Sequence, residues 1–124
     1  MKIFSRRIEV KEWLNYHNIE CYIIHDDLTV DVEFGNISIK TRMVNIPIQF
    51  GVVGGDFDCS RLGLTTLKGF PKLVDGYFDC SWNNLESLKY LPEIKGWLYC
   101  DDNLKDSGEY YKWKYHYLMN QRNE

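Results

Sequence analysis

Three cysteines recur at a nearly constant interval in the second half of the chain, and each is the next-to-last residue of a similar short sequence motif. Each motif begins at a glycine and ends at the residue after the cysteine: Gly55 to Ser60, Gly76 to Ser81 and Gly96 to Asp101. A period of about twenty residues is the signature of a repeat architecture, in which each repeat buries its apolar face only by stacking on its neighbours. The sequence therefore predicts a solenoid with Cys59, Cys80 and Cys100 in one inward column of its core.

The second repeat shows the pattern most clearly. Phe78 and Cys80 are two residues apart, so a short strand points both side chains to one face. Asn83 follows where the chain must turn, and Leu85 and Leu88 fit a tight turn or coil that returns beneath the strand. A proline then ends the turn, because it cannot continue a helix or a central strand, and the next glycine lets the chain re-enter a strand.

The motif carried by Phe78, Cys80, Asn83 and Leu85 is similar to the leucine-rich repeat signature. The longer pattern G-x-F-D-C-S-x-N-x-L resembles the short leucine-rich-repeat-like arrays of small tailed-phage proteins, over roughly residues 8–105. In leucine-rich repeats the Asn side chain bonds backbone groups of adjacent turns. By this resemblance, Asn83 and Asn103 are expected to bridge turns, whereas the first repeat departs from the pattern and has a leucine at that position.

The fold class that follows is α+β: a short leucine-rich-repeat-like solenoid with a small parallel sheet of about four strands. We predict one domain, with an N-terminal helix and hairpin cap over residues 1–33, the solenoid over 34–105 and a C-terminal cap helix over 106–124. Val10, Trp13, Leu14 and His17 have the spacing of one helical face. Caps are expected because the end turns of a solenoid expose an apolar cross-section.

The predicted C-terminal helix is unusually aromatic. Asp106 or Ser107 can cap its start, and it carries two stripes of large side chains: Tyr110, Trp113 and Tyr117 on one, Tyr111, Tyr115 and Leu118 on the other. One interpretation is that the helix only plugs the end of the array. The other is that the second stripe stays exposed and binds a partner or a second copy of the chain.

The inward positions also define which residues point outward from the predicted sheet. Parallel strands about 4.8 Å apart would bring the outward residues into columns. The candidate partner-binding residues are those of the columns together with a turn residue at their edge: Asp56, Asp58, Tyr77, Asp79, Trp82, Trp97, Tyr99 and Asp101.

Two interpretations of this face remain open. Asp58 and Asp79 would be adjacent like charges, which is mildly destabilising, so a function could account for them. In that case the face is an acidic and aromatic patch for a basic protein surface, with Tyr and Trp as anchors. Alternatively it is a solvated strand face, on which the carboxylates only discourage edge pairing with other chains.

Other classes of function find little support. The formal net charge of −3 argues against a general binder of nucleic-acid backbone, and no stretch reaches about 18 apolar residues. His17, His25 and His116 are scattered, no second ligand pair follows Cys21 and His25 at zinc spacing, and no Gly-rich phosphate loop is present. The sequence predicts no metal, no cofactor and no catalytic residues, and its cysteine usage is typical of a reducing cytoplasm.

These expectations combine into a non-enzymatic protein-binding module. By the resemblance, it would be phage-encoded, would act in the cytoplasm of an infected bacterial cell and would block a host protein such as a defence effector. The alternative is a structural or assembly protein that forms a homo-oligomer, with a homodimer as the simplest case, through Tyr111, Tyr115 and Leu118. Neither hypothesis involves direct contact with nucleic acid or with a membrane.

Overall fold

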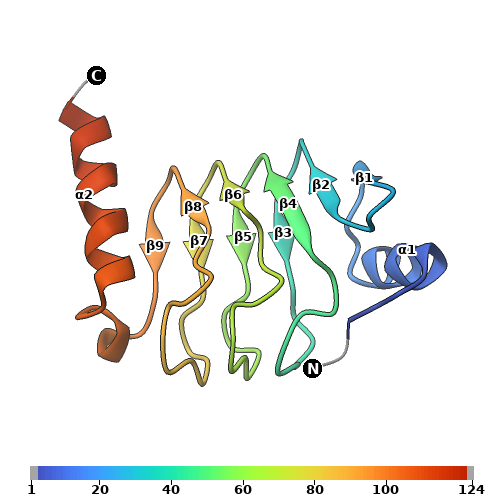
Figure 1. Ribbon diagram of the computed structural model, residues 1–124, viewed down its shortest axis with the longest axis horizontal. Coiled ribbons are helices and arrows are strands. Elements are labelled where there is room, and N and C mark those ends of the chain that lie inside the picture. The colour runs from blue at the N-terminus through green and yellow to red at the C-terminus, as the bar shows by residue number, and fades with distance from the viewer. Residues whose placement is uncertain (1–2, 123–124) are drawn as a thin grey trace.

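The chain winds into an α+β solenoid of roughly four turns with one helix at each end (Figure 1). This computed structural model describes residues 3–122 of the 124-residue sequence. The helix α1 spans Arg7–Tyr16 and the helix α2 spans Gly108–Arg122. Residues 1–2 and 123–124, which the predicted caps include, lie outside the described part of the chain.

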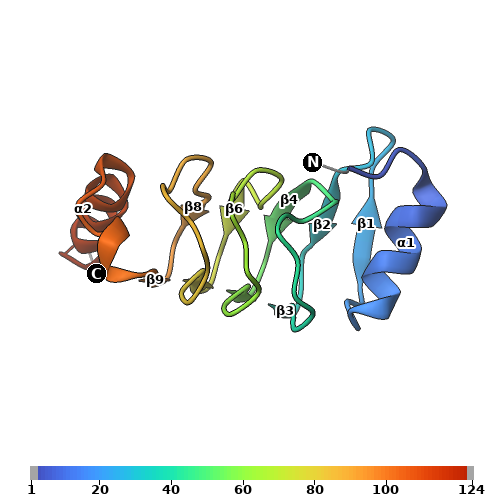
Figure 2. The ribbon, with the colours of Figure 1, turned by 90° about the horizontal axis from the view of Figure 1, so that it is seen from below.

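Two sheets, not one, run along the solenoid, and Figure 2 shows them as separate layers of the coil. The five-stranded sheet contains, in spatial order, β1 (Tyr22–Ile24), β2 (Val30–Val32), β4 (Phe50–Val53), β6 (Leu73–Val74) and β8 (Glu93–Ile94). The four-stranded sheet contains β3 (Ile37–Ser38), β5 (Phe57–Asp58), β7 (Phe78–Asp79) and β9 (Leu98–Tyr99). All neighbours pair in parallel except β1 and β2, which form the predicted antiparallel hairpin.

The four-stranded sheet is the one that the repeated cysteine-containing motifs predict. Cys59 and Cys80 are fully buried and Cys100 is nearly so, which confirms the inward column. A cluster of phenylalanines lies beside them, with the ring of Phe57 at 5.5–5.7 Å from those of Phe50, Phe70 and Phe78. The core is therefore continuous from turn to turn, as a stacked repeat requires.

The five-stranded sheet corrects the prediction of a single small sheet. The segment between each proline and the next glycine was expected to be the end of a turn, but it forms a strand, as in β6 after Pro71 and β8 after Pro92. In β6 and β8 only one residue, Val74 or Ile94, is buried. The strands β5 and β7 are equally short, but buried and outward residues alternate from Phe57 to Cys59 and from Phe78 to Cys80. No such alternation marks β6 and β8, which follow prolines, so their sequences resemble turns.

Asn83 joins two turns of the solenoid through both ends of its amide. Its Oδ1 accepts the backbone N–H groups of Leu62, Gly63 and Leu64 at 2.9–3.0 Å, and its Nδ2 donates to the carbonyl oxygen of Cys59 at 2.9 Å. The prediction for Asn83 is thus confirmed, whereas the same prediction for Asn103 is wrong. Asn103 lies exposed in a 3₁₀ turn, Asp102–Leu104, and the preceding turn is bonded instead by Asp101, whose Oδ1 accepts the N–H of Trp82.

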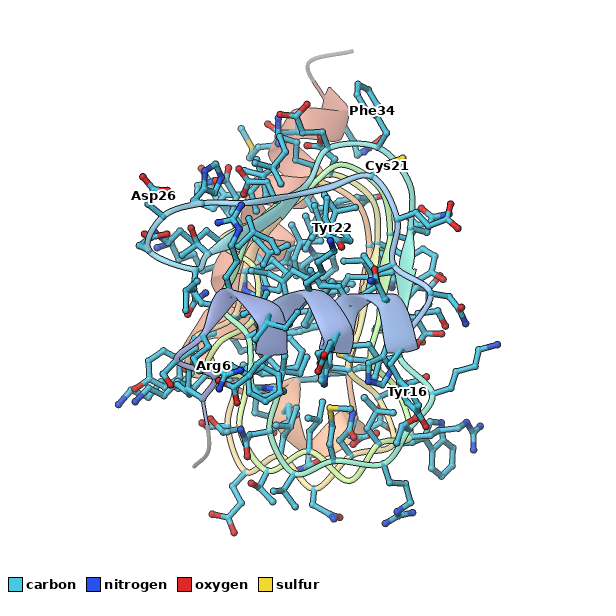
Figure 3. All side chains as sticks on the ribbon, turned by 90° about the vertical axis from the view of Figure 1, so that its right-hand side faces the viewer. Arg6, Tyr16, Cys21, Tyr22, Asp26 and Phe34 are labelled. Atoms are coloured by element: carbon cyan, nitrogen blue, oxygen red, sulfur yellow. The ribbon has the colours of Figure 1, made fainter. Side chains whose placement is uncertain are left out.

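Each end of the solenoid is covered by a helix. At the N-terminal end, Val10 and Leu14 of α1 are buried against the core, and Figure 3 shows α1 lying across this end with Tyr22 of the hairpin beside it. At the other end Ser107, one of the two predicted capping residues, caps the start of α2, since its Oγ accepts the N–H of Tyr110 at 3.2 Å. Neither helix is long and apolar enough to cross a bilayer, a finding that covers the described residues only.

Candidate functional site

The outward residues of the four-stranded sheet form the columns that the sequence predicts. Asp58 of β5, Asp79 of β7 and Tyr99 of β9 are in register on adjacent parallel strands. The column before it contains Asp56, Tyr77 and Trp97, and the column after it contains Ser60, Ser81 and Asp101. We call these nine residues and the turn residue Trp82 the acidic-aromatic face.

The carboxylates of Asp58 and Asp79 each have a local structural role. Asp58 Oδ1 accepts the backbone N–H of Ser60 at 3.0 Å and its Oγ–H at 2.7 Å. Asp79 Oδ1 accepts the same two groups of Ser81, at 3.0 and 2.5 Å. Each aspartate therefore fixes the turn that follows its strand. The cost of placing two like charges side by side is offset by these turns, so their presence does not require a binding function.

Asp56 and Asp101 bond the neighbouring turn instead of their own. Asp56 Oδ1 accepts the N–H of Tyr77 at 2.9 Å, and Asp101 Oδ1 accepts that of Trp82 at 2.8 Å. Gly76 is required beside the first of these bonds, because a Cβ there would overlap Asp56 Oδ1. Side-chain oxygens thus complete the hydrogen bonding between turns where the strands are too short to do so.

Tyr77 lies at the centre of the carboxylates. Partial burial raises the pKa of its phenol, and the negative charges of Asp58, Asp56 and Asp79 raise it further. The ring of Tyr77 also meets that of Tyr99 edge to face, with centroids 5.7 Å apart. The two rings form a ridge beside a strongly negative surface, and Tyr99 leaves 48% of its area exposed.

Trp82 and Trp97 differ in how available they are to a partner. Trp82 is 67% exposed, has a left-handed backbone (φ 58°) and carries the guanidinium of Arg61 over its ring at 4.9 Å. Trp97 instead turns toward α2, where its ring lies 5.1 Å from those of both Trp113 and Tyr117. Trp97 therefore belongs in part to the contact between the solenoid and α2, which sequence reasoning did not foresee.

The two stripes of α2 have different surroundings. Tyr110 and Trp113 are buried against the last turn, and Trp113 Nε1 donates to the Gly96 carbonyl oxygen at 3.3 Å. The second stripe faces away from the solenoid and remains exposed over about half of each side chain or more: Tyr111, Tyr115 and Leu118. The helix therefore seals the solenoid with one stripe and presents the other to solvent.

The thiols of the inward column have little reactivity. Burial raises the pKa of Cys59 and Cys80 well above the usual range and that of Cys100 to about 11. The Sγ of Cys59 donates to the Asp79 carbonyl oxygen at 3.1 Å. Over residues 3–122 no group of three or more His, Cys, Asp or Glu side chains is arranged to hold a metal ion.

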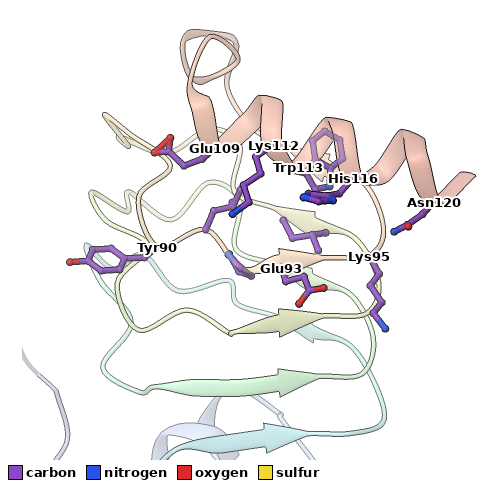
Figure 4. Close-up of a pocket in the computed structure, with 11 residues that line it drawn as sticks. Tyr90, Glu93, Lys95, Glu109, Lys112, Trp113, His116 and Asn120 are labelled. Atoms are coloured by element: carbon purple, nitrogen blue, oxygen red, sulfur yellow. The ribbon is translucent and has the colours of Figure 1, made fainter.

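A groove between α2 and the five-stranded sheet is a feature that the sequence did not reveal. It has a volume of about 620 Å³ and is lined on one side by the segment Tyr90–Lys95 and on the other by one face of α2 (Figure 4). The helix contributes Glu109, Lys112, Trp113, His116 and Asn120. The spacing of these five residues marks a helical face, but only the packing of α2 shows what the face lies against.

Comparison with known proteins returned no match: no family model, no curated protein and no solved structure is significantly similar to the chain.

Proposed function

We propose that the chain is a non-enzymatic protein-binding module that uses the acidic-aromatic face to occupy a basic surface on another protein. The observation that carries the proposal is the register of Asp58, Asp79 and Tyr99, which places two carboxylates beside an exposed aromatic ring. Aromatic anchors beside charges of one sign are typical of protein interfaces that select an oppositely charged partner.

The aspartates can serve both the turn and a partner. Within the described part of the chain, the hydrogen bonds of Asp58 and Asp79 to their serines all use Oδ1. Their Oδ2 atoms are therefore available to lysine or arginine side chains of a partner. Trp82, which is the most exposed aromatic residue of the face, would extend the contact at the turn edge.

The resemblance to leucine-rich-repeat-like phage proteins sets the proposed context. The bridging amide of Asn83 supports a leucine-rich-repeat-like array, in which α1 with its hairpin and α2 act as the caps. In this proposal the protein acts in the cytoplasm of an infected bacterial cell. There it would block a host protein, such as a defence effector, by covering its basic surface, without direct contact with nucleic acid or membrane.

Affinity capture from a bacterial lysate, followed by mass spectrometry, tests this function. The wild-type chain is expected to retain a partner with a basic surface, and an Asp58→Asn/Asp79→Asn variant is expected to lose it. Asparagine keeps the Oδ1 acceptor that the serines need, so the variant removes charge without breaking the turns. Retention of the same partner at the same level by the variant would show that the acidic-aromatic face is not the binding surface.

One observation favours a second function, a structural or assembly protein. Tyr111, Tyr115 and Leu118 are 57%, 62% and 49% exposed on the outer stripe of α2, and pairing two such stripes would bury them. Light scattering of the pure protein separates the two functions. A stable dimer that a Tyr111→Ala/Tyr115→Ala variant abolishes would favour assembly, and a monomer would exclude it.

A further inference from the structure

The groove beside α2 lies along a strand edge that has hydrogen-bonding capacity left over. A column of carbonyl groups runs through the five-stranded sheet, in which each carbonyl oxygen accepts an N–H from the next turn. Val32 O accepts from Gly54 at 2.8 Å, Val53 O from Asp75 at 2.9 Å and Val74 O from Lys95 at 3.0 Å. Register pairs place Val32, Val53, Val74 and Ile94 in this one column.

Ile94 is the last member of the column, and no turn follows it in the sheet. The strand β8 has β6 on one side, and its other side faces the groove. No hydrogen bond among the described residues goes to the Ile94 carbonyl oxygen. The helix α2 contacts Trp97, next to β9, through Trp113, and the groove lies between α2 and β8 (Figure 4).

We infer that this groove binds an extended, net acidic segment of a partner protein, which adds a strand to the edge of β8. The unused Ile94 carbonyl on the strand edge is complementary to an N–H group of another extended backbone, and peptides are recognised in this way by strand addition. The interior of a helix could not supply that donor, because its N–H groups are bonded within the helix.

The dimensions of the groove fit a short segment. Along α2 the groove extends from Glu109 to Asn120, about 16 Å at the rise of an α-helix. An extended chain advances about 3.3 Å per residue, so about five residues fill this length. Alternate side chains of the segment would point inward, toward the half-buried Leu91 and the small exposed parts of Ile94 and Trp113.

The charged residues around the groove indicate which net charge a bound segment should carry. A second hollow of about 370 Å³ borders the first, and the two share Tyr90 and Leu91 in their linings. The groove itself has two lysines, Lys95 (paired with Asp75 at 3.8 Å) and Lys112, against Glu93 and Glu109, and the excess of positive charge comes from Lys68 and Lys72 of the second hollow. A net acidic segment is complementary to this lining, which carries the opposite sign to the acidic-aromatic face.

A library of random twelve-residue peptides, displayed and selected on the intact protein, tests the inference. Enriched peptides are expected to be net acidic with apolar residues at alternate positions. Their dissociation constants should rise about tenfold or more in a Lys95→Glu/Lys112→Glu variant. Lys114→Glu is the matched control, because Lys114 is exposed on α2 but does not line the groove, and it should change the constant less than about twofold.

N-methylation of the selected peptide gives the readout specific to strand pairing. Methyl groups on alternate backbone nitrogens should abolish binding, and methyl groups on the intervening nitrogens should leave it intact, because only one set faces β8. The inference is overturned if no peptide is enriched, if binding ignores the groove substitutions, or if both methylation patterns act alike. It is also overturned if the protein dimerises through β8, with the dimer lost in the Lys95→Glu/Lys112→Glu variant.

The inference and the proposed function can fail separately. The Asp58→Asn/Asp79→Asn variant should bind the selected peptides as the wild type does, since those residues lie on the other sheet.

Discussion

Asp58 and Asp79 face outward in register on neighbouring strands, and each bonds the serine two residues ahead of it through a single oxygen, Oδ1. One side chain thus performs two separable tasks: it closes a turn and it contributes charge to the acidic-aromatic face. Substitutions that keep the acceptor but remove the charge distinguish the two tasks.

For the pair of aspartates, Asp58→Asn/Asp79→Asn should leave the free energy of unfolding within about 0.5 kcal/mol of wild type, because the Oδ1 acceptors remain. Asp58→Ala, in contrast, should lose about 1 kcal/mol by leaving the Ser60 N–H and hydroxyl unpaired. Urea unfolding measures both. Equal stability losses in the asparagine and alanine variants would mean that the hydrogen bonds to serine do not hold the turns.

Asn83 is expected to be the most sensitive polar residue of the solenoid. Asn83→Ala removes the acceptor shared by Leu62, Gly63 and Leu64 and the donor to Cys59, so several partly buried backbone groups lose their partner. A loss of about 2–4 kcal/mol in the free energy of unfolding follows.

The matched control for that substitution is Asn103→Ala. Asn103 occupies the same repeat position but is exposed, so its replacement should change stability by less than about 0.5 kcal/mol. Similar losses at Asn83 and Asn103, measured by urea unfolding under the same conditions, would contradict the bridging role of Asn83.

The buried thiols predict a loss of stability in alkali. Burial raises the pKa of Cys59 and Cys80 above their ordinary value of 9.0, so above pH 9.0 the unfolded chain releases protons that the folded chain keeps. Stability is therefore complete below pH 9.0 and falls as the pH rises beyond it, by about 1.4 kcal/mol per pH unit for each of these two thiols, and Cys100 adds to the loss up to its pKa of about 11.

Urea midpoints between pH 8 and pH 10.5 measure this dependence. Cys80→Ala should reduce the slope, and Cys21→Ser should not, because Cys21 is exposed. An unchanged slope in Cys80→Ala would show that the inward thiols are not its cause.

The sequence predicted the part of the fold that repeats. The positions of Cys59 and Cys80 in their repeated motifs predicted β5 and β7. They also predicted which neighbouring residues face outward, because successive side chains of a strand point to opposite faces. It also separated the two stripes of α2, since helical spacing alone determines them.

What the sequence could not predict depends on contacts between distant segments. In the second sheet, β6 and β8 each have one buried residue soon after a proline, so only the stacking of turns defines them as strands. The packing of Trp97 on Trp113 and the groove along Ile94 arise from where α2 lies on the last turn. The prediction for Asn103 failed because the chain there forms the 3₁₀ turn Asp102–Leu104 instead of repeating the turn that contains Asn83.

The most direct measurement of the central proposal compares two surfaces of the protein for one captured partner. Isothermal titration calorimetry would give the dissociation constant for wild type, for Trp82→Ala/Tyr99→Ala on the acidic-aromatic face and for Tyr111→Ala/Tyr115→Ala on α2. All four side chains are exposed, so the folded state should tolerate each pair of substitutions. The proposal predicts a loss of about a hundredfold for the first variant, as for aromatic hot spots, and less than about threefold for the second. Full affinity in Trp82→Ala/Tyr99→Ala together with lost affinity in Tyr111→Ala/Tyr115→Ala would contradict it.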